Sequence, residues 1–288
     1  MMVYELLNIA ILFLLLGLVS VAYSVRVLLK GRVRYDRVNR QGGSVLLGKP
    51  LMEMAYWGLQ PVGRLLVFLK VSPNQLSWAS LVLGGIAGVA FAYGHFGYAA
   101  VFATYSALFD ALDGMVARLT GHASDSGEVL DAAVDRYVEF FFFAGLIVYY
   151  RHSPILVLVA LAALMGSFMI SYSTAKAEAM QLPPPAGIMR RPERAVYLTL
   201  GAVLSTIPMP WLETTFGYDS SIGYPMIAAL LFVGTMANIS AVERLWTIAL
   251  WIREREVLPP PPEELLEPLN TEEEADGVSS PLAPKHTS

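Results

Sequence analysis

Long apolar stretches alternate with short polar connections along this chain. A membrane-spanning helix needs about 20 mostly apolar residues, and windows of that length recur through the sequence. The first window starts with Glu5 rather than with basic residues, and its apolar stretch is longer than that of a signal peptide. The pattern predicts an all-α, polytopic membrane helix bundle with spans at roughly 5–29, 75–94, 97–119, 128–150, 154–178, 193–213 and 222–250.

The stretch between the first two windows has a mixed pattern. Residues 49–70 place charged side chains, such as Glu53 and Arg64, among Leu, Met, Tyr and Trp. This suits an amphipathic helix in the membrane interface, and a plain connector is the alternative. Pro73 then predicts the start of the next helix, because proline is favoured in a first helical turn.

Composition divides the chain into four predicted parts. The chain is 55% hydrophobic and only 15% charged, whereas soluble proteins are about a quarter charged. The acidic, Pro-rich end resembles disordered segments. Its net charge is −6, so the total of −4 leaves the membrane body near +2. The parts are an N-terminal span (1–30), a basic linker with the amphipathic helix (31–70), a six-span domain (71–257) and the tail (258–288).

Cations are concentrated on one side of the predicted spans. By the positive-inside rule, the basic segment after the first span is cytoplasmic and the N-terminus lies outside. Among the predicted outer connections, Arg151 is the single Lys or Arg. We therefore expect a multi-pass plasma (inner) membrane protein. Its cytoplasmic cations are Arg26, Lys30, Arg32, Arg34, Arg37, Arg40, Arg118, Arg190, Arg191, Arg253 and Arg255.

Four aspartates interrupt the apolar pattern at the cytoplasmic ends of two predicted spans. Asp110 and Asp113 share one helix face, and Asp131 and Asp135 share another. Four neighbouring carboxylates repel one another unless positive charge neutralises them, and a hard divalent cation is the usual neutraliser. The alternative is a helix end in water, where Asp is ordinary. We expect a bound divalent cation at these aspartates, and Mg²⁺ or Mn²⁺ is the metal that the family resemblance described below implies.

Other metal chemistry finds little support in the composition. The chain contains no cysteine, which excludes disulfides, thiolate catalysis and Cys-based metal sites. His122 is the one histidine near the aspartates, and it lacks the partners of a zinc site. Small residues beside the acids, among them Gly114, predict a cleft that a ligand can enter. No nucleic-acid partner is expected.

The acidic run carries a family resemblance. Asp-x2-Asp-Gly-x2-Ala-Arg-x8-Gly-x3-Asp-x3-Asp, from Asp110 to Asp135, resembles the signature of the CDP-alcohol phosphatidyltransferases. The resemblance covers roughly residues 70–250. It implies an Mg²⁺-dependent enzyme of phospholipid biosynthesis, in which an alcohol oxygen attacks the lipid-linked phosphorus of CDP-diacylglycerol and releases CMP. It also implies a homodimer.

Roles for individual residues follow from the same resemblance. It implies that Asp135 acts as general base toward the acceptor alcohol, besides sharing the metal. The implied metal ligands are Asp110, Asp113, Asp131 and Asp135, and the implied CDP-lipid contacts are Asn74, Gly114, Ala117, Arg118 and Gly127.

A second group of cations bears on the acceptor. Lys176, Arg191 and Arg194 lie at the same predicted aqueous mouth, and guanidinium groups suit phosphate oxygens, so a phosphorylated alcohol is predicted. Simple positive-inside flanking is the alternative. Residues 187–194 resemble the inositol-phosphate-using branch of the family. Lys176 and Thr174 depart from the Lys-Ala-Arg-Ala-Glu run of that branch, which leaves glycerol 3-phosphate or another alcohol open.

Two functions of other classes also fit acids within membrane spans. A divalent-cation transporter would present clustered aspartates as well. Such transporters often contain inverted repeats and broken helices, and the sequence shows no convincing example of either. A family member that has lost activity and acts as a membrane scaffold is disfavoured by the complete acid set.

Overall fold

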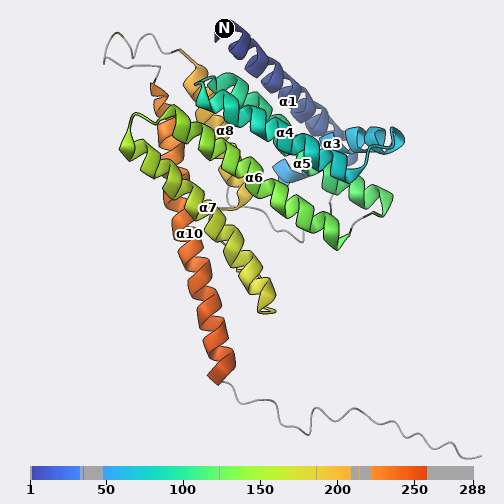
Figure 1. Ribbon diagram of the computed structural model, residues 1–288. Coiled ribbons are helices and arrows are strands. Elements are labelled where there is room, and N and C mark those ends of the chain that lie inside the picture. Colours follow the sequence, from blue (N-terminus) through green and yellow to red (C-terminus); the bar gives the residue numbers. More distant parts are fainter. Residues whose placement is uncertain are drawn as a thin grey trace, which may run out of the picture. The chain divides into compact units, whose positions relative to one another are not determined.

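A computed structural model describes residues 2–32, 35, 48–122, 124–185, 187–208, 214 and 222–257. Within these residues the protein is all helical, without strands (Figure 1). Most of the predicted basic linker and the whole acidic tail lie outside the described residues. The helices are α1 (Met2–Lys30), α3 (Lys49–Phe68), α4 (Pro73–Ala92), α5 (Phe96–Thr120), α6 (Asp125–Tyr149), α7 (Pro154–Ala179), α8 (Arg191–Thr206) and α10 (Tyr224–Val257).

Each predicted span coincides with a helix, which confirms the all-α membrane bundle. Among the described residues, α1, α4, α5, α7 and α10 are long and apolar enough to cross a membrane. The helix α6 falls outside this group because of its charged residues, and α8 because it has only 16 residues. Both nevertheless pack along spanning helices, α6 on α4 and α7, and α8 on α5.

The helix α4 is central among the helices that carry the aspartates, because both α5 and α6 pack along it. Its glycines allow this. A Cβ on Gly84 would lie 2.8 Å from Val138 Cγ2, and one on Gly145 of α6 would collide with the carbonyl oxygen of Gly88. Small residues at helix interfaces let backbones approach closely. The backbones of α4 and α6 are therefore in direct contact, which fixes the position of the acids on α6.

Polar side chains also join two of the other helices and cap the start of α4. Asn238 of α10 donates its amide to the carbonyl of Ala162 on α7 at 2.8 Å. This contact gives Asn238 a structural role between two membrane helices. The start of α4 is a capping box, in which Gln75 N–H donates to Ser72 Oγ at 3.3 Å and Ser72 N–H donates to Gln75 Oε1 at 2.9 Å. The predicted helix start at Pro73 is confirmed.

The helix α1 packs on α3, α5 and α8. Its Glu5 is buried and accepts a hydrogen bond from Gly97 N–H at 3.1 Å and contacts His95 Nδ1 at 3.0 Å. A carboxylate is favourable there, because Gly97 belongs to the first turn of α5, where backbone N–H groups lack helical partners. The chain forms two compact units, residues 1–248 and 249–288, and the second is described only for the end of α10.

Candidate active site at the aspartate cluster

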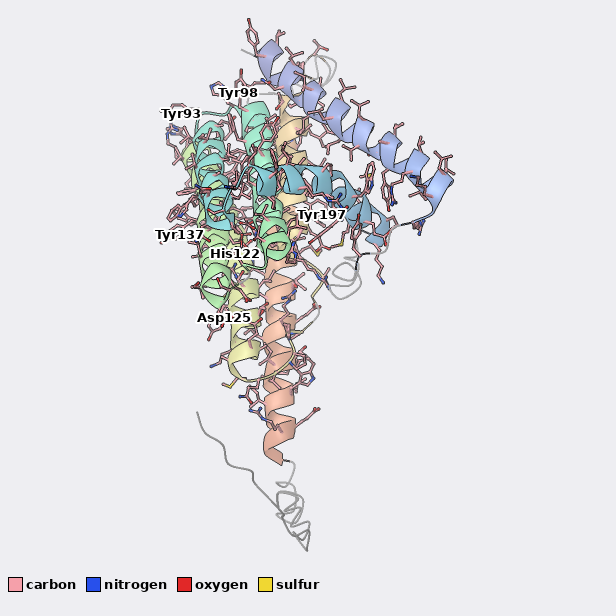
Figure 2. The ribbon with its side chains drawn as sticks, turned by 90° about the vertical axis from the view of Figure 1, so that its right-hand side faces the viewer. Tyr93, Tyr98, His122, Asp125, Tyr137 and Tyr197 are labelled. Atoms are coloured by element: carbon pink, nitrogen blue, oxygen red, sulfur yellow. The ribbon has the colours of Figure 1, made fainter. Side chains whose placement is uncertain are left out.

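A short turn brings the end of α5 beside the start of α6. The α5 helix ends at Gly121, whose φ of 70° is the left-handed conformation that glycine adopts readily. Ser124 then caps α6, with its Oγ accepting from Gly127 N–H at 3.2 Å. His122 and Asp125 mark this turn, at the opposite end of the helices from Tyr93 and Tyr98 (Figure 2). The aspartates of both helices thereby reach the same end of the bundle.

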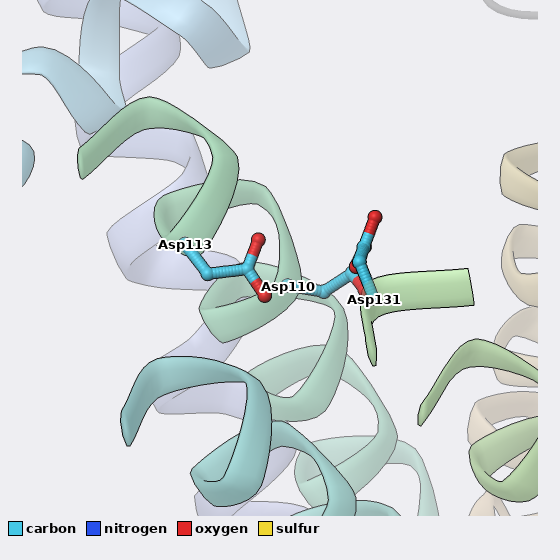
Figure 3. A group of neighbouring side chains, drawn as sticks. All are labelled: Asp110, Asp113 and Asp131. Carbon is cyan, nitrogen blue, oxygen red and sulfur yellow. The ribbon is translucent and has the colours of Figure 1, made fainter. Parts of the chain in front are cut away.

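Three of the four predicted aspartates converge (Figure 3). Asp110, Asp113 and Asp131 each offer a carboxylate oxygen, and these oxygens all lie within 4.8 Å of one another. Asp113 is buried, and the other two are half-buried. Carboxylate oxygens at this spacing suit Mg²⁺ or Mn²⁺, whose charge offsets the repulsion among them. The residues present fit a divalent cation.

The helix α4 supports this cluster. Ser77 Oγ donates to Asp113 Oδ2 at 2.6 Å, and both side chains are buried. Sequence reasoning missed Ser77. The signal for it was present, because Ser77 is one helical turn after the predicted ligand residue Asn74 and so shares its face. Asn74 itself is exposed, at the end of α4 that reaches the aspartates.

Arg191, the first residue of α8, joins the two acid-bearing helices. Its Nη1 donates to Asp110 Oδ2 at 3.2 Å, and its Nη2 forms an ion pair with Asp135 Oδ1. Arginine suits such bridging, because its planar fork presents several donors at fixed angles. The start of α8 is therefore held against α5 and α6 at the cluster.

Asp135 lies beside the group of three carboxylates rather than within it. It is buried, and besides Arg191 it contacts Arg136 Nη1 at 3.6 Å. Arg191 links it to Asp110. Its predicted roles as shared metal ligand and general base are compatible with this position, and both stay predictions.

Arg194, a predicted acceptor contact, is buried in an ion pair. Its Nε and Nη2 donate to the two carboxylate oxygens of Glu139 on α6, at 2.7 and 3.2 Å. Only 1% of Arg194 is exposed. Sequence reasoning missed Glu139, although it is one turn after Asp135, just as Arg194 is one turn after Arg191. The ion pairs Arg191–Asp135 and Arg194–Glu139 therefore join α6 to α8 at positions one helical turn apart.

The remaining predicted ligand residues surround the cluster more loosely. Arg118 is exposed, and its Nη2 donates to the Tyr56 hydroxyl of α3 at 3.0 Å. Gly114 and Ala117 are half-buried on α5, and Lys176 is half-buried in the last turn of α7. The structure thus groups the three metal-binding candidates with Arg191 and Asp135, while Arg118 reaches toward α3.

The family follows from comparison with known proteins. The family model described as CDP-alcohol phosphatidyltransferase matches residues 70–235, which include every aspartate of the cluster. The chain belongs to this family. It is therefore a transferase of a membrane-enzyme family, and the carboxylate group agrees with the family's divalent cation.

Named relatives of the transferase include phosphatidylinositol phosphate synthases. The one from Corynebacterium glutamicum is 36% identical over 53% of this chain and 72% of its own length. A crystal structure of the Mycobacterium tuberculosis enzyme with CDP-DAG bound is 28% identical, with a TM-score of 0.57 over 65% of this chain and 92% of that one. Another crystal structure of the same enzyme, with the same identity and TM-score, is in complex with manganese and citrate.

Proposed function

We propose that this transferase moves a phosphatidyl group from CDP-diacylglycerol to a phosphorylated alcohol, with inositol phosphate as the first candidate, and releases CMP. The observation that carries the proposal is the group of three carboxylates with Arg191 beside it. The names of the relatives and the CDP-DAG bound to the mycobacterial enzyme support the same substrates.

Different residues of the cluster would bind the metal, accept the proton and position the base. Asp110, Asp113 and Asp131 would hold Mg²⁺, which neutralises the pyrophosphate of the CDP-lipid when bound. Asp135 would take the proton of the acceptor hydroxyl as that oxygen bonds to the lipid-linked phosphorus and the bond to CMP breaks. Arg191 holds Asp135 in position.

The acceptor phosphate would meet the cations at the mouth of the cluster. Arg191 contacts Asp110 and Asp135 and is half-buried, so it can contact a ligand that arrives from water. Lys176, half-buried in the last turn of α7, is the second candidate cation. Arg194 already binds Glu139 through two nitrogens, so it would position α8 against α6 as well as add positive charge near the acceptor. Glycerol 3-phosphate is the second candidate, since it presents the same phosphate chemistry.

The distribution of cations supports a wider proposal on placement. The cluster would face the cytoplasm from the inner membrane, with residues 71–257 as the catalytic domain. A homodimer belongs to the same proposal, and it rests on family membership.

Release of CMP by the purified protein tests the function. With CDP-diacylglycerol and Mg²⁺, we expect activity with inositol phosphate and none with inositol or serine, while glycerol 3-phosphate tests the second candidate. Asp113→Asn should lower turnover at least about 100-fold, whereas Asp125→Asn, at an exposed aspartate of α6, should not. Asp135→Asn should stop turnover while CDP-lipid binding persists.

Two results would overturn the proposal. Activity with neutral alcohols alone would remove the anionic acceptor. Metal flux across proteoliposomes without any CMP release would favour the transporter instead.

A further inference from the structure

A cavity of about 550 Å³ lies between α1 and α3. Its size is within the range of about 300–1,000 Å³ that is typical of small-ligand sites. Both helices precede the residues that match the family model. The proposed transfer reaction makes no use of this cavity, whose lining consists of Leu18, Val19, Ala22, Trp57, Gly58, Gln60, Pro61 and Arg64.

The walls of the cavity are held by direct contacts between the two helices. The rings of Tyr23 and Trp57 lie with their centroids 5.6 Å apart. A Cβ on Gly58 would lie 2.8 Å from Val19 Cγ1, so glycine permits the close approach of α3 to α1. The cavity is therefore an open groove between the two packed helices.

The chemistry of the cavity changes along its length. Leu18, Ala22 and Arg26 are four residues apart on α1 and share one face, so an apolar wall leads toward a cation. Arg26 Nη1 is buried and has no hydrogen-bond partner in the described part of the chain. Arg64 adds a second cation from α3. Arg26, Arg64 and the buried carboxylate of Glu53 all act electrostatically on the Tyr35 hydroxyl, so these three charges lie in one neighbourhood, where the cations outnumber the acid.

The surroundings indicate what fills such a space. The helix α1 is apolar enough to span a membrane, and most of its large side chains, such as Leu14 and Val21, are exposed. The cavity therefore opens among lipids, whose acyl chains match its apolar wall. Arg64 is exposed, and Arg26 is half-buried with an Nη1 that has no hydrogen-bond partner among the described residues. An anionic headgroup would therefore meet two cations and would supply the acceptor that Arg26 Nη1 lacks.

We propose that this cavity binds one anionic phospholipid of the surrounding membrane. An acyl chain lies along Leu18, Ala22 and Trp57, and the phosphate meets Arg64 and Arg26. This lipid is a resident ligand that fastens α1 to α3, separate from the CDP-lipid consumed at the aspartates.

Native mass spectrometry of the whole protein tests the proposal. Protein released from nanodiscs that contain equal amounts of phosphatidylglycerol and phosphatidylcholine should retain one phosphatidylglycerol. Ala22→Trp fills the cavity and should abolish retention, whereas Ala10→Trp, at an exposed position of the same helix, should not. Arg64→Gln should lower the preference for phosphatidylglycerol about fivefold, as for one cation at an anionic lipid, and Arg151→Gln should leave it unchanged.

The outcomes separate this site from the active site. Retention that is unchanged in both Ala22→Trp and Arg64→Gln overturns the proposal, and so does displacement of the retained lipid by CDP-diacylglycerol. Asp113→Asn protein, which should not turn over substrate, should still retain the lipid. The result is therefore informative even if the proposed transfer reaction is wrong.

Discussion

At the scale of single residues, buried charges near the aspartate cluster occur as pairs between helices. Arg191 binds Asp110 and Asp135, and one turn further along α8, Arg194 binds Glu139. An isolated charge in such surroundings costs several kcal/mol, so each pair constrains the register of α8 against α6. The more deeply buried pair, Arg194 with Glu139, therefore helps to position Arg191 at the aspartate cluster.

Removal of one partner of the deeper pair tests this arrangement. Glu139→Leu leaves Arg194 buried and unpaired, and it should lower the free energy of unfolding by about 3–5 kcal/mol. The double variant Glu139→Leu/Arg194→Met replaces both charges by apolar groups and should recover most of that loss. Chemical unfolding in detergent micelles measures both effects, with Glu178→Leu, at an exposed acid of α7, as control. A double variant as unstable as the single one would contradict the pairing argument.

The individual roles within the site divide into those that sequence could predict and those that it could not. Spacing alone placed Asp110 and Asp113 on one face, and Asp131 on a neighbouring helix. It could not show that Ser77 bonds Asp113 or that Arg194 turns to Glu139, because both contacts depend on how separate helices pack. Contacts between distant segments are not encoded in local periodicity.

At the scale of elements, the helices follow from hydrophobic pattern, whereas their spacing follows from glycine. Each predicted span coincides with a helix. In a membrane, an α-helix lets a long apolar segment form all its backbone hydrogen bonds within itself. The predicted span 193–213 is too long at its end, since α8 ends at Thr206 and Ile207 is extended, while residues 209–213 lie outside the described part. The close approach of α4 to α6 at Gly88 was not predicted.

Two neighbouring glycines of α4 offer a matched test of that approach. A Cβ on Gly88 would lie 2.5 Å from the carbonyl oxygen of Phe141, so Gly88→Ala should force the helices apart and cost about 1–3 kcal/mol. A Cβ on Gly85 would lie 3.8 Å from the Phe141 ring, an ordinary contact. Gly85→Ala should be neutral or stabilise by up to about 1 kcal/mol through helix propensity. Unfolding and CMP release should both separate the variants, and equal effects would contradict direct backbone contact.

At the scale of the whole molecule, two helices of the chain precede the residues that match the family model. The match begins at residue 70, after α1 and α3. The helix α1 is nevertheless packed on α5 and α8 within the same compact unit. Hydropathy predicted α1 as a span, but its attachment through a buried carboxylate required the structure, because Glu5 in the sequence indicated only that a signal peptide was unsuitable.

Glu5 provides the last test, that of how α1 is attached. Glu5→Ala removes the acceptor of the buried Gly97 N–H and the partner of the half-buried His95, at a cost of about 1–3 kcal/mol. Backbone hydrogen exchange at Gly97 and throughout α1 should accelerate. Asn8→Ala is the control, because Asn8 donates only to Tyr4 of its own helix among the described contacts.

Catalysis should respond differently from attachment. Gly97 and Asp110 lie 13 residues apart on α5, about 20 Å at 1.5 Å per residue, so the loss of Glu5 leaves the aspartates in place. Turnover of CDP-lipid by Glu5→Ala should therefore stay near that of the unmodified protein while exchange in α1 rises. If exchange at Gly97 does not change, Glu5 is not what holds α1 to α5. If turnover falls together with the attachment of α1, then α1 contributes to the activity of the helices that carry the aspartates.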